Sequence, residues 1–295
     1  MPELPDLTIY AERLDALARG RRLGRLRVGN PFVLRTVTPA PAAFAGRAFL
    51  GTRLLGKRLL LEFEGEHFAV IHLMVLGRLH WRKAGAALSR ANGLAAFDFD
   101  HGALLLVEHG KKRRASLHLV AGRAALAEFD RGGLDALAAT PAAFAARLTA
   151  TNHTLKRALT DPCVLAGVGN AYSDEILHRA RLSPFRQTGA LTDEEMRRLF
   201  LATREVLLEW IERLRRQAGD GWPEKVTAFR PDMAVHGRYR QPCPACGAPV
   251  QRIVYADNEA NYCARCQTGG RLLADRALSR LLKANWPKTL DELEQ

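Results

Sequence analysis

The stretch CPACGAPVQRIVYADNEANYCARC at residues 243–266 contains two Cys-x2-Cys pairs, Cys243/Cys246 and Cys263/Cys266, with 16 residues between them. Four cysteines at this spacing suit one tetrahedral zinc ion held by two short turns, with a β-hairpin between them. Such a hairpin buries too little apolar surface to fold alone, so metal binding would supply its folding free energy. Disulfides are the alternative, which a cytosolic chain disfavours. Because four thiolates fill the coordination shell, we predict one structural zinc and no catalytic metal.

Composition describes a basic, globular chain with room for two or three domains. The 295 residues are 47% hydrophobic and 25% charged. We find no run near the ~18 apolar residues of a membrane span and no secretion-signal pattern at the start, so we expect a cytoplasmic protein. The formal net charge is +13, which favours a polyanionic partner, with a merely basic surface as the alternative. Basic clusters such as residues 111–114 are spread along the chain, and this favours a folded nucleic-acid-binding face over a basic tail.

Apolar periodicity divides the chain into regions of different class. A first helix is predicted with Asp6 as N-cap and with Gly20 after its end. Short apolar or alternating stretches between residues 25 and 110 predict a β-sandwich or barrel. From about residue 134 the pattern becomes helical, and Thr192 and Glu195 predict a capping box at the start of the longest helix. The stripe that follows is predicted to face a core: Leu199, Thr203, Val206, Trp210 and Leu214.

The stretch VLAGVGNAYSDEILHRARLSP at residues 164–184 places Gly169 and Asn170 at the start of another amphipathic helix. Such a start offers backbone N–H groups to an anion, with an ordinary capping loop as the alternative. The remaining cysteine, Cys163, is predicted to be a buried packing residue. Together, the zinc hairpin, the basic surface and this turn favour DNA binding.

The chain begins MPELPD, and two interpretations of Pro2 compete. Proline is tolerated at the start of a helix, where its missing N–H is not needed. Alternatively, removal of Met1 makes Pro2 an N-terminal secondary amine and a potential nucleophile. These residues alone favour the first interpretation.

MPELPD at residues 1–6, LLGKRLLLEF at 54–63, LAGVGNAYSDEIL at 165–177 and the four-cysteine hairpin resemble, in this order, the formamidopyrimidine-DNA glycosylase and endonuclease VIII family. The resemblance covers nearly the whole chain and implies an α+β multidomain fold. It implies an N-terminal catalytic helix with a β-sandwich, then a helix-two-turn-helix domain, then a zinc finger. We place these parts at residues 1–133, 134–235 and 236–270, followed by a C-terminal extension at 271–295.

The resemblance also implies a bifunctional enzyme of base excision repair that acts on damaged DNA. Pro2 would attack C1′ of the damaged nucleoside, expel the base and form an iminium ion that permits β-elimination of the 3′ phosphate. Glu3 matches the family's acid/base carboxylate, and Lys57 matches the lysine that contacts the sugar-phosphate beside the lesion. A helix N-terminus and a nearby lysine would lower the pKa of the amine. The family acts as a monomer in the bacterial cytoplasm, in association with nucleoid DNA.

The implied DNA contacts include both matches and departures. Asn170 and the backbone amide at Gly169 match the family's phosphate grip, and Lys156 matches a basic position of the DNA-binding surface. Where the family has a phosphate-gripping arginine in the finger, this chain has Asn258, so Arg252 or Arg265 would have to substitute.

Two further DNA-contacting segments also depart from the family pattern. The wedge segment reads HLMVLG, which puts Met74 and Val75 at the positions that plug the base stack. The loop that reaches the opposite base reads GKKRRA and includes Arg113, and we expect the loop at residues 219–232 to contribute to lesion specificity.

The departures leave a second function open. Loss of the finger arginine and of the usual wedge favours a non-catalytic sensor of DNA damage or DNA structure. Retention of Pro2, Glu3 and Lys57 together favours the enzyme. The extension after residue 270 has a helical leucine rhythm, at Leu272, Leu273, Leu278, Leu281 and Leu282, and would either cap the finger or meet a protein partner.

Overall fold

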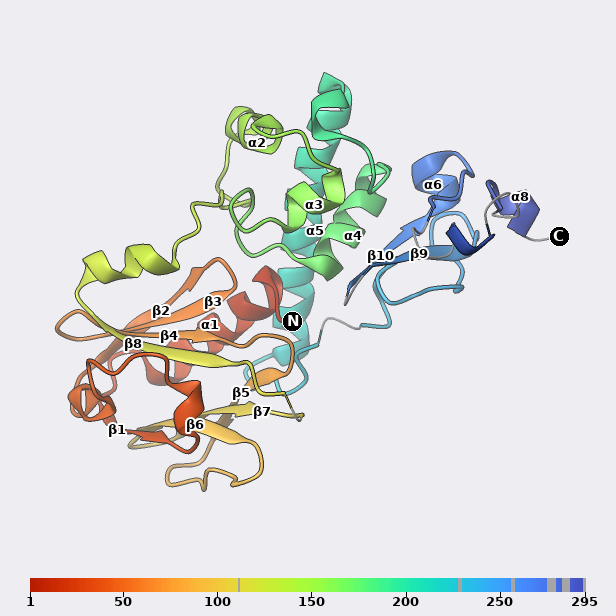
Figure 1. Ribbon diagram of the computed structural model, residues 1–295. Coiled ribbons are helices and arrows are strands. Elements are labelled where there is room, and N and C mark those ends of the chain that lie inside the picture. Colours follow the sequence, from red (N-terminus) through yellow and green to blue (C-terminus); the bar gives the residue numbers. More distant parts are fainter. Residues whose placement is uncertain (111, 228–229, 256–257, 275–279, 283–286, 294–295) are drawn as a thin grey trace. The chain divides into compact units, whose positions relative to one another are not determined.

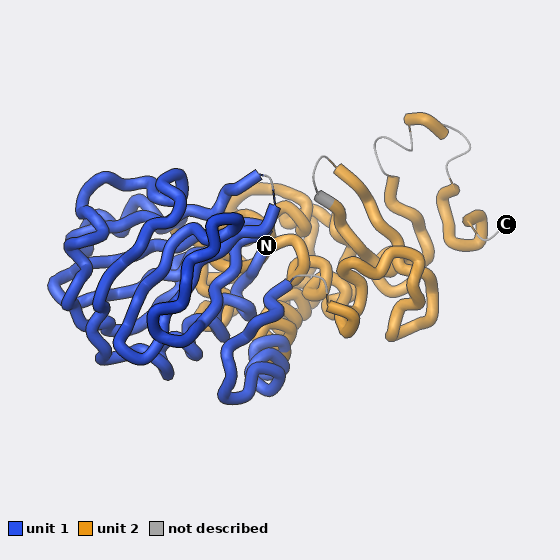
Figure 2. Tube along the Cα trace, turned by 90° about the horizontal axis from the view of Figure 1, so that it is seen from below, with its two compact units in different colours: residues 1–131, 210–227 blue, residues 132–209, 228–295 orange. Residues whose placement is uncertain are grey.

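The computed structural model describes residues 1–110, 112–227, 230–255, 258–274, 280–282 and 287–293. Its chain forms two compact units, residues 1–131 with 210–227 and residues 132–209 with 228–295 (Figure 2). The boundary falls inside the longest helix, α5 (Asp193–Ala218). Among the described residues, no helix is both long and apolar enough to cross a membrane.

Unit 1 is a β-sandwich preceded by helix α1 (Leu4–Ala18) (Figure 1). Two antiparallel four-stranded sheets have the strand orders β1-β6-β7-β5 and β2-β3-β4-β8. Two separate sheets confirm the sandwich and exclude the barrel. The strands are β1 (Leu23–Val28), β2 (Phe49–Leu55), β3 (Arg58–Phe63), β4 (His67–His72), β5 (Gly77–Arg82), β6 (Gly93–Phe99), β7 (Ala103–Glu108) and β8 (Ser116–Ala121).

The core of unit 1 forms where the apolar faces of the two sheets and of α1 meet. Phe63 of one sheet stacks on Phe97 of the other, with 6.4 Å between ring centroids. Tyr10 and Leu14 of α1 belong to the same buried cluster, as the helical spacing predicts. A smaller cluster on the outer side of β3, β4 and β8 is covered by the 3₁₀ helix η3 (Arg123–Phe129).

The start of α1 differs from the prediction by one turn. The helix begins at Leu4, and Glu3 rather than Asp6 is its N-cap. Asp6 Oδ2 accepts the backbone N–H of Glu3 at 3.1 Å, while the Glu3 side chain accepts the backbone N–H of Asp6. The prediction was wrong because a carboxylate at the third helical position closes a capping box instead of starting the helix. The end agrees, since the helix stops at Ala18 and Gly20 follows with φ +80°.

Unit 2 contains the predicted helices α2 (Pro141–Thr149), α4 (Asn170–Ala180) and the first part of α5, together with the short α3 (Leu155–Thr160). The capping box before α5 is confirmed: Thr192 N–H donates to Glu195 Oε2 at 2.9 Å, and Glu195 N–H donates to Thr192 Oγ1 at 3.2 Å. All five residues of the predicted apolar stripe on α5 are buried. Cys163 is exposed, not buried, because it lies in the surface turn after α3.

The zinc-finger region of unit 2 consists of hairpin strands β9 (Val250–Tyr255) and β10 (Asn258–Cys263), the short helix α6 (Ala264–Thr268) and α8 (Leu290–Leu293). Leu272, Leu273 and Leu290 join the finger's buried cluster. The described parts of the extension therefore cap the finger, which was one of the two roles expected for this segment. The predicted helical rhythm was wrong at Leu272 and Leu273, which lie outside any helix and pack on the finger. Leu278 lies outside the described residues.

Candidate functional site

In unit 1, the N-terminus of the chain is a buried, charged site. Pro2 is buried and Glu3 is 2% exposed. The pKa of the Met1 amine is lowered from its usual value, mainly because the amine is buried. From the sequence, a helix N-terminus and a lysine were expected to lower the pKa of this amine. Burial, which is the largest cause, was not predicted.

Two nearby cations lower the pKa of the same amine. Arg78 and Lys57 lower it, whereas Glu3 and Asp6 raise it. These four charged groups are therefore close enough to the N-terminus to act on its protonation. Arg78 lies on β5 and was not predicted, because nothing in the linear pattern places that strand beside the N-terminus.

Lys57 is held at the tip of a hairpin. Leu55 of β2 pairs with Arg58 of β3, which leaves Gly56 and Lys57 as a two-residue turn. Gly56 has φ +60°, the conformation that the first position of a type II′ turn requires. The turn therefore fixes where the lysine ammonium can reach.

Two histidines lie near this hairpin, in a position that the sequence did not reveal. His72 of β4 pairs with Arg58 of β3, and His118 of β8 pairs with Val70. Burial, with Arg58 and Lys57 nearby, lowers the pKa of His72 to about 4. Burial, with Arg58 and Arg35 nearby, lowers the pKa of His118. The His72 ring is therefore neutral at pH 7 and can hydrogen-bond without carrying charge.

The loop between β4 and β5 carries the predicted wedge. Met74 is partly buried with φ +53°, while Val75 is 54% exposed and its neighbour Leu76 is 42% exposed. A Cβ on Gly77 would lie 2.2 Å from the Leu73 carbonyl oxygen, so only glycine allows this tight turn. The exposed apolar tip consists of Val75 and Leu76, and not of Met74.

The predicted opposite-base loop is closed by a buried carboxylate. Glu108 accepts the backbone N–H groups of Arg114 and Ala115 at distances of 2.9 and 3.0 Å. Arg113 is exposed and donates to the carbonyl of Ala91. Lys111 of the same basic cluster lies outside the described residues.

The segment that follows α5 is fastened to the sandwich of unit 1. The Trp222 indole N–H donates to the Leu79 carbonyl at 2.8 Å. Glu224 pairs with His80 at 2.7 Å and with Arg82 at 2.5 Å. The first half of the expected specificity loop is therefore anchored on β5, whereas its residues 228–229 lie outside the described part.

In unit 2, the anion-ready turn precedes α4 as predicted, with Gly169 at the N-cap and Asn170 as the first helical residue. Lys156 was expected on the DNA-binding surface, but it is 4% exposed. Its Nζ donates to the Asn170 carbonyl at 2.7 Å, to Ser173 Oγ at 2.8 Å and to Asp174 Oδ1 at 2.5 Å. In this structure, Lys156 therefore holds the first turn of α4.

The next residues of α4 hold the finger. Asp174 Oδ2 pairs with His236 Nδ1 at 2.8 Å and accepts from Asn261 Nδ2 of β10 at 3.4 Å. Glu175 accepts three consecutive backbone N–H groups, of residues 234–236, at 2.7 to 3.0 Å. Sequence reasoning missed this network because Asp174 and Glu175 look like an ordinary polar face until their partners, about 60 to 90 residues later, are placed.

Arg252 and Arg265, which would have to replace the family's finger arginine, already have protein partners. Arg252 lies 4.4 Å from the centroid of the Tyr239 ring and 3.6 Å from Glu259. Arg265 donates to the Cys246 carbonyl at 3.2 Å. Asn258 pairs through its backbone with Tyr255, and its side chain is not among the parts that the structure describes.

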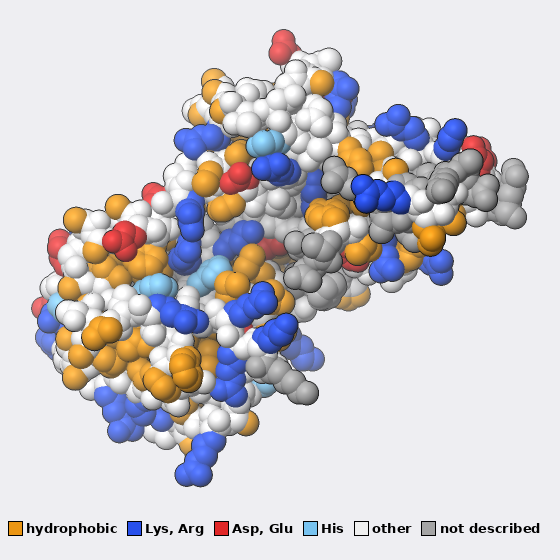
Figure 3. Space-filling view, in the orientation of Figure 1, with side chains coloured by type: hydrophobic (Ala, Val, Ile, Leu, Met, Phe, Trp, Pro, Cys, Tyr) orange, Lys and Arg blue, Asp and Glu red, His pale blue; other side chains and the backbone are white. Residues whose placement is uncertain are grey.

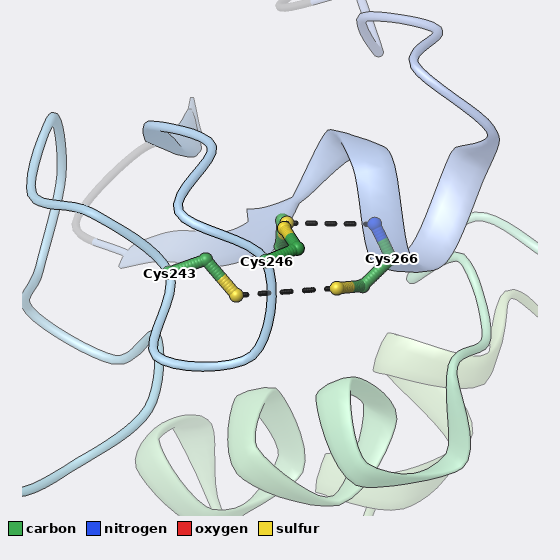
Figure 4. A group of neighbouring side chains, drawn as sticks. Cys243, Cys246 and Cys266 are labelled. Carbon is green, nitrogen blue, oxygen red and sulfur yellow. Dashed lines mark hydrogen bonds between the residues drawn. The ribbon is translucent and has the colours of Figure 1, made fainter.

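The four finger cysteines fit a zinc ion. Their Sγ atoms all lie within 4.8 Å of one another, with 3.4 Å between Cys246 and Cys263. The Sγ atoms of Cys243 and Cys266 are 3.9 Å apart, and these two cysteines point toward each other in Figure 4. Zn–S bonds of ~2.3 Å place the sulfurs of a tetrahedral site about 3.8 Å apart. The donor set is closed, which confirms the prediction of one structural zinc. Burial raises the pKa of Cys266 to about 11, so the metal must displace thiol protons when it binds.

Basic side chains reach the surface of each unit. Figure 3 shows Lys and Arg side chains on the drawn face of both units, in keeping with the excess of 44 basic over 31 acidic residues. Exposed apolar side chains also occur on this face. Such a surface favours contact with a polyanion.

Three family models match consecutive parts of the chain. They are the formamidopyrimidine-DNA glycosylase N-terminal domain at residues 1–116, the formamidopyrimidine-DNA glycosylase H2TH domain at 133–218, and the zinc finger found in FPG and IleRS at 240–269. The matches confirm the predicted order of β-sandwich, helix-two-turn-helix region and zinc finger.

Curated relatives match over most of the chain. The formamidopyrimidine-DNA glycosylase of Thermus thermophilus is 37% identical over 92% of this chain and 100% of its own length. That of Chloroflexus aurantiacus is 33% identical over 90% of this chain and 98% of its own. An uncharacterized formamidopyrimidine-DNA glycosylase-like protein of Mycobacterium tuberculosis is 42% identical over 51% of this chain and 94% of its own length.

Solved structures share the fold. The crystal structure of the MutM (Fpg) protein from Thermus thermophilus has a TM-score of 0.75 at 34% identity, over 90% of this chain and 98% of that one. A complex between Lactococcus lactis Fpg and abasic-site DNA has a TM-score of 0.79, over 90% of this chain and 99% of that one. Its 21% identity supports the fold alone.

Proposed function

The chain belongs to the formamidopyrimidine-DNA glycosylase family of zinc-finger DNA-repair proteins, and we propose that it is a bifunctional DNA glycosylase and abasic-site lyase. Its substrates would be oxidised, ring-opened or otherwise damaged bases in DNA. The observation that carries the proposal is the buried N-terminus, whose amine has a lowered pKa and lies among Glu3, Lys57 and Arg78.

The lowered pKa provides the nucleophile. After removal of Met1, the Pro2 nitrogen would be the N-terminal amine, one residue further along the same buried stretch. A buried amine among cations loses its proton more readily, so a larger fraction is neutral at pH 7. Only this neutral amine has the lone pair that attacks carbon.

The reaction then proceeds in two stages on one amine. The Pro2 lone pair forms a bond to C1′, and the damaged base leaves with the electrons of the glycosidic bond. Glu3 takes up the Pro2 N–H proton and delivers it to the sugar ring oxygen as the C1′–O4′ bond breaks and the iminium ion forms. The Glu3 carboxylate then takes a C2′ proton, the C3′–O bond breaks as the 3′ phosphate leaves by β-elimination, and water hydrolyses the resulting imine to release Pro2.

Neighbouring groups would position the DNA. Lys57 at the hairpin tip and the neutral His72 ring would bind a phosphate near the lesion. The turn at Gly169 and Asn170 would bind another phosphate through backbone N–H groups. Arg113 adds an exposed cation. We assign Lys156 to holding α4, since its ammonium is buried.

Val75 and Leu76 would fill the stack when the damaged base leaves it. We further propose that the domains end at residues 133, 235 and 270, and that the protein acts as a monomer in the bacterial cytoplasm.

A non-catalytic damage or structure sensor is the second candidate. It is favoured by the presence of Asn258 at the position of the family's finger arginine. A sensor would bind abasic or distorted DNA tightly and would not cleave it at any pH.

Borohydride trapping separates the two candidates. Borohydride reduces the iminium ion and links the protein covalently to abasic or lesion-bearing DNA. We expect a covalent adduct with the protein that begins at Pro2 and none with the protein that retains Met1, whose Pro2 nitrogen lies in a peptide bond. Tight binding without an adduct, together with unchanged behaviour of Pro2→Gly, would establish the sensor. A panel of lesion-bearing duplexes and single strands, scored separately for base release and nicking, would identify the substrate.

A further inference from the structure

Helix α4 reaches the zinc site through one side chain. His178 in its last turn places Nε2 3.2 Å from Sγ of Cys243. Cys243 is buried and His178 is partly buried. The contact joins the helical part of unit 2 directly to a metal ligand.

The chemistry of the sulfur decides the direction of this hydrogen bond. A zinc-bound cysteine is a thiolate, which can only accept. The imidazole must therefore carry a proton on Nε2 and donate it toward Cys243. One ring proton is enough, so the contact does not require a charged ring.

The position of His178 on α4 gives the contact a wider role. Asp174 lies four residues earlier and therefore on the same helical face. Asp174 contacts Asn261 of β10, and His178 contacts Cys243, so two consecutive turns of α4 hold the finger. The two contacts differ in kind, because only that of His178 ends on a metal-binding atom.

We propose that His178 is a positioning residue of the zinc site, which donates its Nε2–H to the Cys243 thiolate and ties metal retention to α4. Partners that hydrogen-bond metal ligands change metal affinity by about 10- to 100-fold in other sites. This role belongs to His178 and not to the four cysteines, and it does not depend on glycosylase activity.

The test uses the full-length protein with cobalt(II) in place of zinc. A hydrogen bond lowers the energy of the sulfur lone pair, so its loss moves the sulfur-to-cobalt charge-transfer band to longer wavelength. We expect this shift in His178→Phe, with zinc transfer to a chromogenic chelator roughly tenfold faster than in wild type. His178→Gln retains an N–H donor and should recover much of both properties.

A matched control separates the thiolate contact from docking of the finger. Gln267 donates to the Leu182 carbonyl at 2.8 Å and accepts the Cys263 backbone N–H at 2.8 Å. Both contacts are to backbone groups, so Gln267→Leu loosens the finger while leaving the hydrogen bond to Cys243 in place. We expect this variant to retain the wild-type cobalt band.

Two outcomes would overturn the proposal. One is an unchanged band and release rate in His178→Phe. The other is equally fast release from His178→Phe and Gln267→Leu with neither band shifted, which would mean docking alone. If His178→Phe does not fold, NMR of the cadmium-113 form of the wild type decides: a scalar coupling between the metal and the His178 Nε2–H supports the bond, and its absence refutes it.

Discussion

The N-terminal site of unit 1 and the α4–finger network of unit 2 use buried charge in opposite ways. Around the Met1 amine, burial opposes protonation, and Arg78 and Lys57 add to its effect. Around Lys156 in unit 2, a buried ammonium has three oxygen acceptors. The first arrangement makes an amine easier to deprotonate, and the second fixes a helix start. Each can be tested by a change that spares the other.

The largest effect is expected from blocking the N-terminus. Retention of Met1, or any N-terminal tag, leaves the Pro2 nitrogen in a peptide bond without a reactive lone pair. Strand cleavage of abasic DNA should fall roughly a thousandfold or more, which corresponds to about 4 kcal/mol of activation free energy. DNA affinity should stay within a few fold, as measured by fluorescence anisotropy. The control is the same tagged protein after a protease has exposed Pro2, and full cleavage by the uncut tagged form would contradict the mechanism.

The next effect concerns stability of unit 2. Lys156→Met leaves the Asp174 carboxylate buried without its cation, and removing one partner of a buried pair costs about 3–5 kcal/mol. Urea unfolding should show this loss, whereas the exposed Lys112→Met should change little. If Lys156 instead contacts DNA directly, the variant would keep its stability and reduce the salt dependence of DNA binding by about one phosphate contact.

A smaller effect concerns His72, the histidine beside the hairpin that carries Lys57. His72 has a pKa of about 4 when folded and about 6.5 when unfolded, so between these values the unfolded state binds the extra proton. The stability of unit 1 should therefore fall as pH decreases from 6.5 toward 4. At about 1.36 kcal/mol per pKa unit, discounted for partial exposure, the loss is roughly 1–2 kcal/mol.

Thermal unfolding across this pH range measures the effect. His72→Gln should remove this part of the pH dependence, and the exposed His109→Gln should keep it. Equal curves for all three proteins would show that His72 does not titrate as its surroundings imply.

The smallest effect is expected at the wedge. Replacing both Val75 and Leu76 by alanine removes the exposed apolar tip of its loop. Base excision from duplex DNA should slow by roughly three- to tenfold, because less apolar surface fills the gap in the stack. Cleavage of single-stranded abasic DNA should not change. Val37→Ala, at another exposed apolar residue, is the control, and equal losses in both variants would remove the wedge from the mechanism.

Local features of this chain could be predicted from sequence. The Cys-x2-Cys pairs, the Thr192/Glu195 capping box and the stripe on α5 depend on residues close together along the chain, and the structure contains them. The assignment of Asp6 was wrong by one turn because N-cap and third-position carboxylates look alike in sequence.

Features that depend on distant partners could not be predicted. Lys156 looked like a surface cation until Asp174 was placed beside it. Strand β8 was not predicted, so the position of His118 beside Arg58 could not be predicted either. Cys163 was expected to be buried because free cysteines usually are, but it falls in an exposed turn. The roles of Pro2, Glu3 and Lys57 remain proposals.

The packing of Leu272, Leu273 and Leu290 against the finger has a consequence for how this protein can be dissected. Leu290 lies 24 positions after Cys266, yet it shares a buried cluster with Tyr262 and Val250. A fragment cut just after the last cysteine would keep every metal ligand and lose one wall of the core around them. The finger therefore cannot be transferred as residues 243–266 alone. A chimera or a minimal version must include the chain as far as Leu293.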